Sequence, residues 1–250
     1  AVLHAPFIYL GHLYAGWMGY AQDGFSLPYQ FSAVIGSLFY TFLGLVILRK
    51  IFLHFFSEKI TVILFLILVL GTNYLHMNSA CTGLAHVSLF TLYASLLYFT
   101  IKFHEKNSFK SAILIGLSLG FLALIRPTEL IATLIPLLYG VTSWTTFKTR
   151  FVEVFKTHYY WIAIICMILV GSIQLFYWNY TTGSPLFYSY VHNGEALDFN
   201  RPHVIEVLFS FRKGWLIYTP VMILLVLGFI GVYKKHKSLF IGTLAFTIIN

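Results

Sequence analysis

Residues 160–180 read YWIAIICMILVGSIQLFYWNY, a run of 21 residues without a charged side chain. An 18-residue helix rises about 27 Å, which nearly matches a hydrocarbon core of about 30 Å. The ends of the run are aromatic, with Tyr160 and Trp161 at one end and Trp178 and Tyr180 at the other. Aromatic residues gather in this way where a spanning helix meets the membrane–water interface. The run therefore predicts a transmembrane helix.

Similar apolar runs occur along the whole chain. Hydrophobic residues make up 59% of the sequence and charged residues 10%, whereas a soluble domain has about 25% charged residues. The pattern predicts an all-α fold, a polytopic transmembrane bundle of about eight spans that forms a single transmembrane domain over residues 1–250. The expected spans are 31–48, 60–77, 84–101, 111–125, 129–145, 160–180, 216–233 and one that starts at 238.

Lysine and arginine residues are concentrated in every second gap between these runs. Twelve of the sixteen fall in four clusters: Arg49, Lys50 and Lys59; Lys102, Lys106 and Lys110; Lys148, Arg150 and Lys156; Lys234, Lys235 and Lys237. Cytoplasmic loops of multipass membrane proteins retain cations in this way, so we expect the four clusters inside. The net charge of +8 then reflects contacts with membrane lipid at the loop ends, and we expect no nucleic-acid partner.

Two segments do not fit the alternation of spans. Residues 1–20 are apolar but contain His4, Pro6, His12 and several glycines, and we expect an interfacial or re-entrant segment on the outer side. Residues 181–215 form a long outer loop, and loops of this length are often functional. The chain lacks an initiator Met and stops at Asn250 within an apolar run, so we expect a fragment of a longer protein.

The first candidate site is the segment Leu124-Ile125-Arg126-Pro127-Thr128-Glu129-Leu130. Pro127 should break the helix and leave Arg126 and Glu129 at the outer tip of a hairpin. A guanidinium at membrane depth is usually paired or bound to an anion. Two interpretations stay open: Arg126 binds an anionic ligand, or Arg126 and Glu129 satisfy each other.

Histidines near the outer ends of the second and third spans form a second candidate. His86 follows Gly83, while His76, Asn73 and Asn78 precede it. Together they would form a polar outer pocket, although a helix-packing histidine is the commoner outcome. Two histidines without a clear carboxylate ligand are weak evidence for a metal, so we predict no metal site.

Arg212 and Lys213 precede Gly214 and Trp215 at the predicted outer end of the seventh span. Two adjacent cations beside a flexible glycine suit a phosphate or pyrophosphate headgroup. Anchoring to lipid phosphates is the alternative. The outer location favours a ligand, because the twelve lysines and arginines of the four clusters are expected on the cytoplasmic side and these two cations are not.

Three segments carry a resemblance to a known family. Residues 115–130, with Gly116, Gly120 and the Arg126-Pro127-Thr128 turn, resemble the hairpin of integral-membrane glycosyltransferases of the GT-C fold. The closest group is the bacterial relatives of protein O-mannosyltransferase and of lipid A aminoarabinose transferase. Residues 209–220 and 23–30 are also similar to segments of that group. The likeness covers most of the chain through short motifs.

The resemblance implies a bacterial inner-membrane enzyme that moves a sugar from a polyisoprenyl-phosphate donor to an acceptor at the outer face. Arg126, Arg212 and Lys213 would bind the lipid phosphate, and His86 and Glu129 would line the cavity. The catalytic carboxylate of the family lies in a loop that would precede Ala1, so no catalytic residue is assigned here. A divalent cation as cofactor stays open.

Two other function classes remain open. A transporter or flippase of lipid-linked or small polar substrates would place charged or broken-helix sites near the midplane, whereas the ionisable residues of these spans cluster at the outer ends. A non-enzymatic membrane scaffold would leave Arg126 and the long outer loop unexplained.

Overall fold

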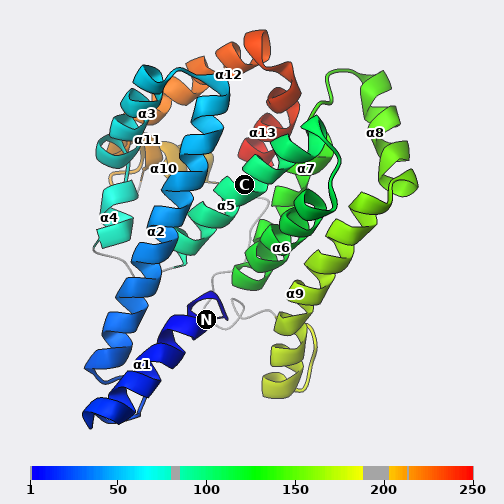
Figure 1. The fold of residues 1–250 in the computed structure, drawn as a ribbon. Helices are drawn as coiled ribbons and strands as arrows, with labels where there is room; N and C mark the ends of the chain where they lie inside the picture. Colours follow the sequence, from blue (N-terminus) through cyan, green and yellow to red (C-terminus); the bar gives the residue numbers. More distant parts are fainter. Residues whose placement is uncertain (1, 80–84, 188–202, 213, 250) are drawn as a thin grey trace. The chain divides into compact units, whose positions relative to one another are not determined.

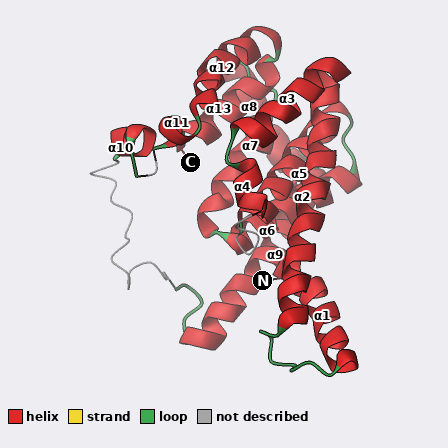
Figure 2. Ribbon diagram, turned by 90° about the vertical axis from the view of Figure 1, so that its left-hand side faces the viewer, coloured by secondary structure: helices red, strands yellow, loops and turns green. Residues whose placement is uncertain are grey.

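The computed structural model describes residues 2–79, 85–187, 203–212 and 214–249, and within these ranges it contains helices and no strand (Figure 2). The expected all-α fold is confirmed. The elements are η1 (Val2–His4), α1 (Ala5–Met18), α2 (Leu27–Phe55), α3 (Glu58–Gly71), α4 (Tyr74–Ser79), α5 (His86–Glu105), α6 (Phe109–Ile125), η2 (Pro127–Thr133), α7 (Leu134–Leu138), α8 (Trp144–Lys156), α9 (His158–Thr182), α10 (Val204–Phe209), α11 (Trp215–Tyr218), η4 (Pro220–Met222), α12 (Ile223–Lys235) and α13 (Lys237–Ile249).

The chain divides into two units, unit 1 from Ala1 to Tyr98 and unit 2 from Phe99 to Asn250. Among the described residues, two helices are long and apolar enough to cross a membrane by length and composition, α2 in unit 1 and α9 in unit 2. Three shorter apolar segments lie in unit 2: α6, the segment Pro127–Leu138, and α13. The spans predicted at 31–48 and 160–180 thus correspond to continuous helices of membrane length. The eight-span arrangement stays a prediction.

Several predicted spans are interrupted. Residues 60–77 divide into α3 and α4, and residues 129–145 into η2, α7 and a turn before α8. Residues 216–233 divide at Thr219 and Pro220, because proline lacks the N–H that would continue the helix. Apolar composition located these segments correctly as helical, but it overestimated their continuity.

In unit 1, α1 and α2 form an antiparallel hairpin (Figure 1). Gly11 of α1 lies against Ser32 of α2, while Gly36 of α2 lies against His4 and Phe7 at the start of the chain. A Cβ at Gly11 would overlap Ser32 Oγ and lie 3.0 Å from the carbonyl oxygen of Pro28, so a larger residue would require the Ser32 side chain to shift. Residues 2–18 are therefore helical and lie lengthwise along the first half of α2.

Unit 2 is built on α6 and α9, which pack parallel to each other. A Cβ at Gly116 would overlap the carbonyl oxygen of Ala163, and a Cβ at Gly120 would lie 3.0 Å from that of Met167. The contact advances by four residues on both helices, so both run in the same direction. The predicted small-residue face of residues 116–120 is thus a close-packed helix interface.

One end of unit 2 collects the beginnings and ends of several helices. Phe103 lies 5.3 Å from Tyr160 between ring centroids, and His104 stacks on Tyr139 at 4.8 Å. The Gly140 N–H donates to Ser238 O at 2.7 Å. Three of the four cationic clusters lie in the sequence around these contacts, namely Lys102–Lys110, Lys148–Lys156 and Lys234–Lys237. We call this the cationic end of unit 2.

Candidate functional site

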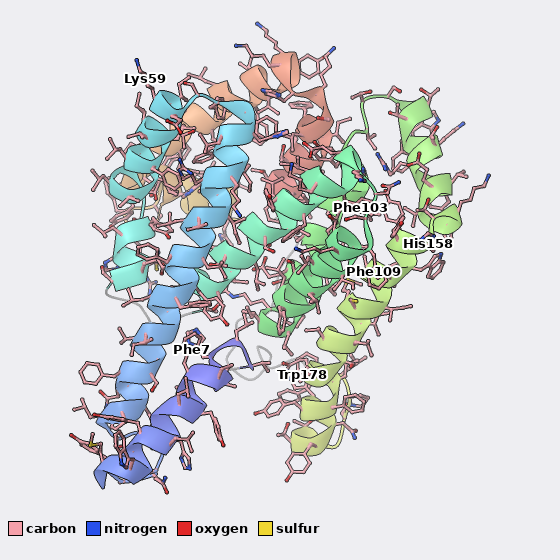
Figure 3. All side chains as sticks on the ribbon, viewed as in Figure 1. Phe7, Lys59, Phe103, Phe109, His158 and Trp178 are labelled. Atoms are coloured by element: carbon pink, nitrogen blue, oxygen red, sulfur yellow. The ribbon has the colours of Figure 1, made fainter. Side chains whose placement is uncertain are left out.

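Arg126 lies at the opposite end of unit 2 from the cationic end. It follows the last residue of α6, a helix of 17 residues that rises about 25 Å. His158 and Trp178, labelled in Figure 3, mark the same two ends on the parallel helix α9. The structure thus separates Arg126 from the lysines near the start of both helices by the length of α6.

The break at Arg126 is a consequence of Pro127. Arg126 has φ −145° and ψ 117°, the extended conformation that a following proline favours. Its N–H still donates to Leu122 O at 2.9 Å, and its carbonyl oxygen accepts from the Glu129 N–H at 2.9 Å. The backbone of the turn is thereby satisfied, and the chain continues as the 3-10 helix η2. The predicted helix break is confirmed.

The two ionisable side chains of this turn differ in exposure. Glu129 is buried, with 8% of its surface exposed, whereas Arg126 is half-buried. The guanidinium makes no hydrogen bond or ion pair to other residues in the described ranges. A half-buried guanidinium without such partners presents a fork of five N–H donors that matches the geometry of a phosphate.

Arg212 is exposed in a tight turn between α10 and α11. Its backbone N–H donates to Ser210 Oγ at 3.1 Å, and the Gly214 N–H donates to Ser210 O at 2.6 Å. A Cβ at Gly214 would overlap that same carbonyl oxygen, so the turn requires glycine. Lys213 lies outside the described residues. The glycine expected to give flexibility instead closes the turn.

His86 begins α5 and is exposed. It belongs to unit 1, so neither unit by itself brings it together with Arg126, Glu129 or Arg212. Asn78 was expected beside it in a polar pocket. The Asn78 carboxamide instead bonds to α2 and α4, because its oxygen accepts from Thr41 Oγ1 at 2.7 Å and its nitrogen donates to Tyr74 O at 2.6 Å. The pocket expected around His86 stays a prediction.

A polar network that the sequence did not reveal connects the N-terminal segment of unit 1 to α2 and α5. Ser88 Oγ lies 3.4 Å from His4 Nε2, the Tyr40 hydroxyl donates to Leu3 O at 2.7 Å, and the Thr91 hydroxyl donates to Tyr40 O at 2.5 Å. Ser88 and Thr91 are buried. Single serines and threonines in apolar runs carry no distinctive spacing, so only their contacts identify this network.

Two cavities are apolar. A groove of about 600 Å³ lies along α1 and α2, lined by Phe7, Leu10, Tyr14, Pro28, Phe31 and Ile35 among others. Figure 3 labels Phe7 on this hairpin. A cavity of about 270 Å³ in unit 2 is lined by residues that include Phe103, Ile115, Leu119 and Tyr160. Neither Arg126 nor Arg212 lines either cavity.

In the part of the chain that the structure describes, no group of three His, Cys, Asp or Glu side chains is placed to hold a metal ion. Comparison with known proteins identifies no relative: no protein-family model, no curated protein and no solved structure matches this chain.

Proposed function

We propose that this chain is the membrane-embedded part of a glycosyltransferase that takes its sugar from a polyisoprenyl-phosphate donor. The observation that carries the proposal is Arg126, a half-buried guanidinium at the end of unit 2 opposite the cationic end. Glu129, Arg212 and Lys213 are the other candidates on this unit, and His86 is the candidate on unit 1. A GT-C fold, as the resemblance of residues 115–130 suggests, would accommodate this chemistry.

The cationic end supports an orientation for unit 2. Cytoplasmic loops retain lysine and arginine, so the end around Phe103, Tyr139 and Tyr160 would face the cytoplasm. Arg126 would then lie near the outer interface, at a depth where a lipid phosphate resides. We propose a multipass protein of about eight spans in a bacterial inner membrane, with α1 as a re-entrant helix because it runs along α2.

Sugar transfer requires two functions from the protein, stabilisation of the departing phosphate and removal of the acceptor proton. The acceptor oxygen attacks the anomeric carbon, the bond from that carbon to the phosphate oxygen breaks, and the phosphate leaves with the electron pair. Cations stabilise the departing phosphate, and a general base takes the acceptor proton. Arg126 and Arg212 supply positive charge for the first task. The base is assigned to no residue of this chain.

A transporter or flippase of lipid-linked substrates is the second candidate, because discontinuous helices occur at transporter sites. The breaks at Thr72–Asn73 and Thr219–Pro220 are of this kind. In the predicted spans 60–77 and 216–233, however, both lie toward the outer end and not at the midplane. This position favours chemistry at the interface over passage through the membrane.

Binding of the lipid carrier tests the proposal directly. The full-length protein in lipid nanodiscs is titrated with undecaprenyl phosphate, and with undecaprenol as the neutral control, and the bound lipid is counted by native mass spectrometry. We expect saturable binding of the phosphate form that Arg126→Ala weakens. Equal binding of the two lipids would contradict the proposal.

Turnover distinguishes the enzyme from the transporter. Proteoliposomes receive undecaprenyl-phosphate mannose or undecaprenyl-phosphate aminoarabinose, and release of undecaprenyl phosphate is followed. Release that depends on Arg126 supports transfer. Movement of the intact donor between leaflets without release would support the flippase.

A further inference from the structure

We propose that α8 is an in-plane membrane helix that docks its exposed aromatic face on an anionic lipid surface at the cationic end of unit 2. The inference does not depend on sugar transfer. It concerns Trp144–Lys156, a 13-residue amphipathic helix that directly precedes the membrane-length helix α9.

The exposed face of α8 is strongly apolar. Trp144 is 68% exposed, Phe151 60% and Phe155 56%, and Phe147 and Val152 are also exposed. The four aromatic residues, at positions 144, 147, 151 and 155, follow the helical spacing of three and four, so they share one side of the helix. In water such a face would be an aggregation liability, and this type of face marks an interaction surface.

The bundle does not cover this face because α8 uses another side to pack. Thr146, Arg150 and Val154, spaced four residues apart, are the half-buried residues of the helix. Arg150 Nη1 donates to the Tyr160 hydroxyl at 2.8 Å and Nη2 donates to Tyr139 O at 3.1 Å. Val154 lines the apolar cavity of unit 2. These contacts hold the helix at α7 and α9 and direct the aromatic residues outward.

The helix cannot itself cross a membrane. Its 13 residues rise about 20 Å, short of a hydrocarbon core of about 30 Å. It also carries Lys148, Arg150, Glu153 and Lys156. The chain turns at Thr157, which has φ −99° and ψ 115°, before α9 begins at His158 (Figure 1). A short amphipathic helix joined by one residue to a helix of membrane length is placed at the membrane–water boundary.

The exposed lysines favour an anionic lipid. Lys148 and Lys156 are exposed on the side of the aromatic face that is turned away from the packed residues, and Lys148 Nζ lies 5.6 Å from the ring centroid of Trp144. Lysine stems extend along apolar surface and keep the ammonium at headgroup level. Basic amphipathic helices with aromatic residues on the apolar face lie in the interface of anionic membranes. The occupant of the face is therefore a phosphatidylglycerol-type lipid surface.

Spin labels on opposite sides of α8 test the placement. The full chain, with Cys81→Ser and Cys166→Ala, carries a nitroxide at Phe151→Cys or at the matched polar position Thr149→Cys, in vesicles of phosphatidylcholine with phosphatidylglycerol. We expect the label at 151 about 5–10 Å below the headgroups, in contact with oxygen and shielded from a water-soluble nickel chelate. The label at 149 should show the reverse.

The outcomes are distinct. Equal nickel access at the two positions would overturn the proposal. Shielding of position 151 from both reagents would assign the face to protein, such as a second copy, and would also overturn it. Phe155→Cys on the same face provides an independent label if Phe151→Cys does not fold, as judged by circular dichroism.

The lysines test the lipid charge. Replacing Lys148 and Lys156 by Gln should lower the ratio of membrane-buried to water-exposed label by roughly fivefold for each lysine in phosphatidylglycerol vesicles. The same change at Lys59, on the other unit, should leave that ratio unaltered. An undiminished ratio in the double variant would refute the role of anionic lipid.

Discussion

Arg150 and Arg126 lie at opposite ends of unit 2, and their surroundings differ. Arg150 donates to Glu153 Oε2 at 3.0 Å, to the Tyr160 hydroxyl and to Tyr139 O. Arg126 is half-buried without a side-chain partner among the described residues, beside the buried Glu129. A guanidinium with three protein partners stabilises the fold, whereas one that the protein leaves without a partner is available to a ligand. We therefore propose Arg150 as a structural arginine and Arg126 as a binding arginine.

The largest effect is expected at the binding arginine. Arg126→Ala should weaken undecaprenyl phosphate binding, and reduce the proposed sugar transfer, by about tenfold to a hundredfold, because a hydrogen bond to a charged group contributes about 1.5–3 kcal/mol. Native mass spectrometry and release of the lipid phosphate measure the two quantities. The melting temperature should stay close to that of the parent protein.

Arg126→Lys separates the effect of charge from that of the planar guanidinium. It keeps the charge but loses the planar fork of donors, so it should bind the lipid phosphate better than Arg126→Ala and less well than the parent protein. Full activity of Arg126→Ala in reconstituted membranes would remove Arg126 from the site.

The structural arginine should show the opposite profile. Arg150→Met removes three hydrogen bonds at the cationic end, and we expect the free energy of unfolding to fall by about 1.5–3 kcal/mol. Thermal unfolding in detergent measures the change, and the affinity for undecaprenyl phosphate should not change. A variant that is as stable as the parent but binds the carrier less well would reverse the assignment of the two arginines.

The distance between the two arginines depends on the parallel contact of α6 and α9. Gly116→Ala places a Cβ where it overlaps Ala163 O, so the helices must separate, at a cost of about 1–3 kcal/mol. Gly171→Ala is the matched control, because a Cβ at that position would have no neighbouring atom within 4 Å among the described residues. Chemical unfolding of both variants tests the interface. Equal stability of the two would show that the glycine contact is unimportant.

The smallest effect is expected in unit 1, at the turn between α1 and α2. The N–H groups of Phe25 and Ser26 donate to Asp23 Oδ1 at 2.8 and 2.9 Å, and these bonds lower the pKa of the Asp23 carboxyl. The stabilisation is present above the usual aspartate pKa of 3.8 and is lost as pH falls through the lowered value. Amide chemical shifts of Phe25 and Ser26 should report that transition.

Asp23→Asn is the control for this turn. It retains a side-chain acceptor but cannot titrate, so the same amide shifts should stay constant with pH. A transition that persists in Asp23→Asn would assign the titration to another group.

Local sequence signals predicted some features of unit 2 well. Pro127 has no N–H and disfavours a helical residue before it, so the break at Arg126 follows from two adjacent residues. Gly116 and Gly120, four residues apart, indicated a close helix contact. The continuity of 60–77 and 216–233 could not be predicted, because apolar composition does not distinguish one helix from two with a short break.

The candidate site was predicted less completely. Proximity of Arg126 and Glu129 follows from their separation of three residues in the chain. Their unequal burial depends on neighbours distant in sequence. Two of the three partners of Arg150, Tyr139 and Tyr160, lie outside α8, whereas Glu153 lies on the same helix. His86 and Arg212 have no local neighbour that fixes their surroundings, so chain position alone could not place them beside Arg126.

Composition and periodicity by themselves determined that this chain is helical, that residues 31–48 and 160–180 lie in helices of membrane length, and that Pro127 ends α6. These are local properties, since a helix forms its backbone hydrogen bonds within its own segment. Only the tertiary structure decided that α6 and α9 run parallel, that Arg150 is enclosed while Arg126 is not, and that the aromatic side of α8 faces outward. Each of these depends on which surfaces meet, and that choice is made by contacts between side chains on different elements of the fold.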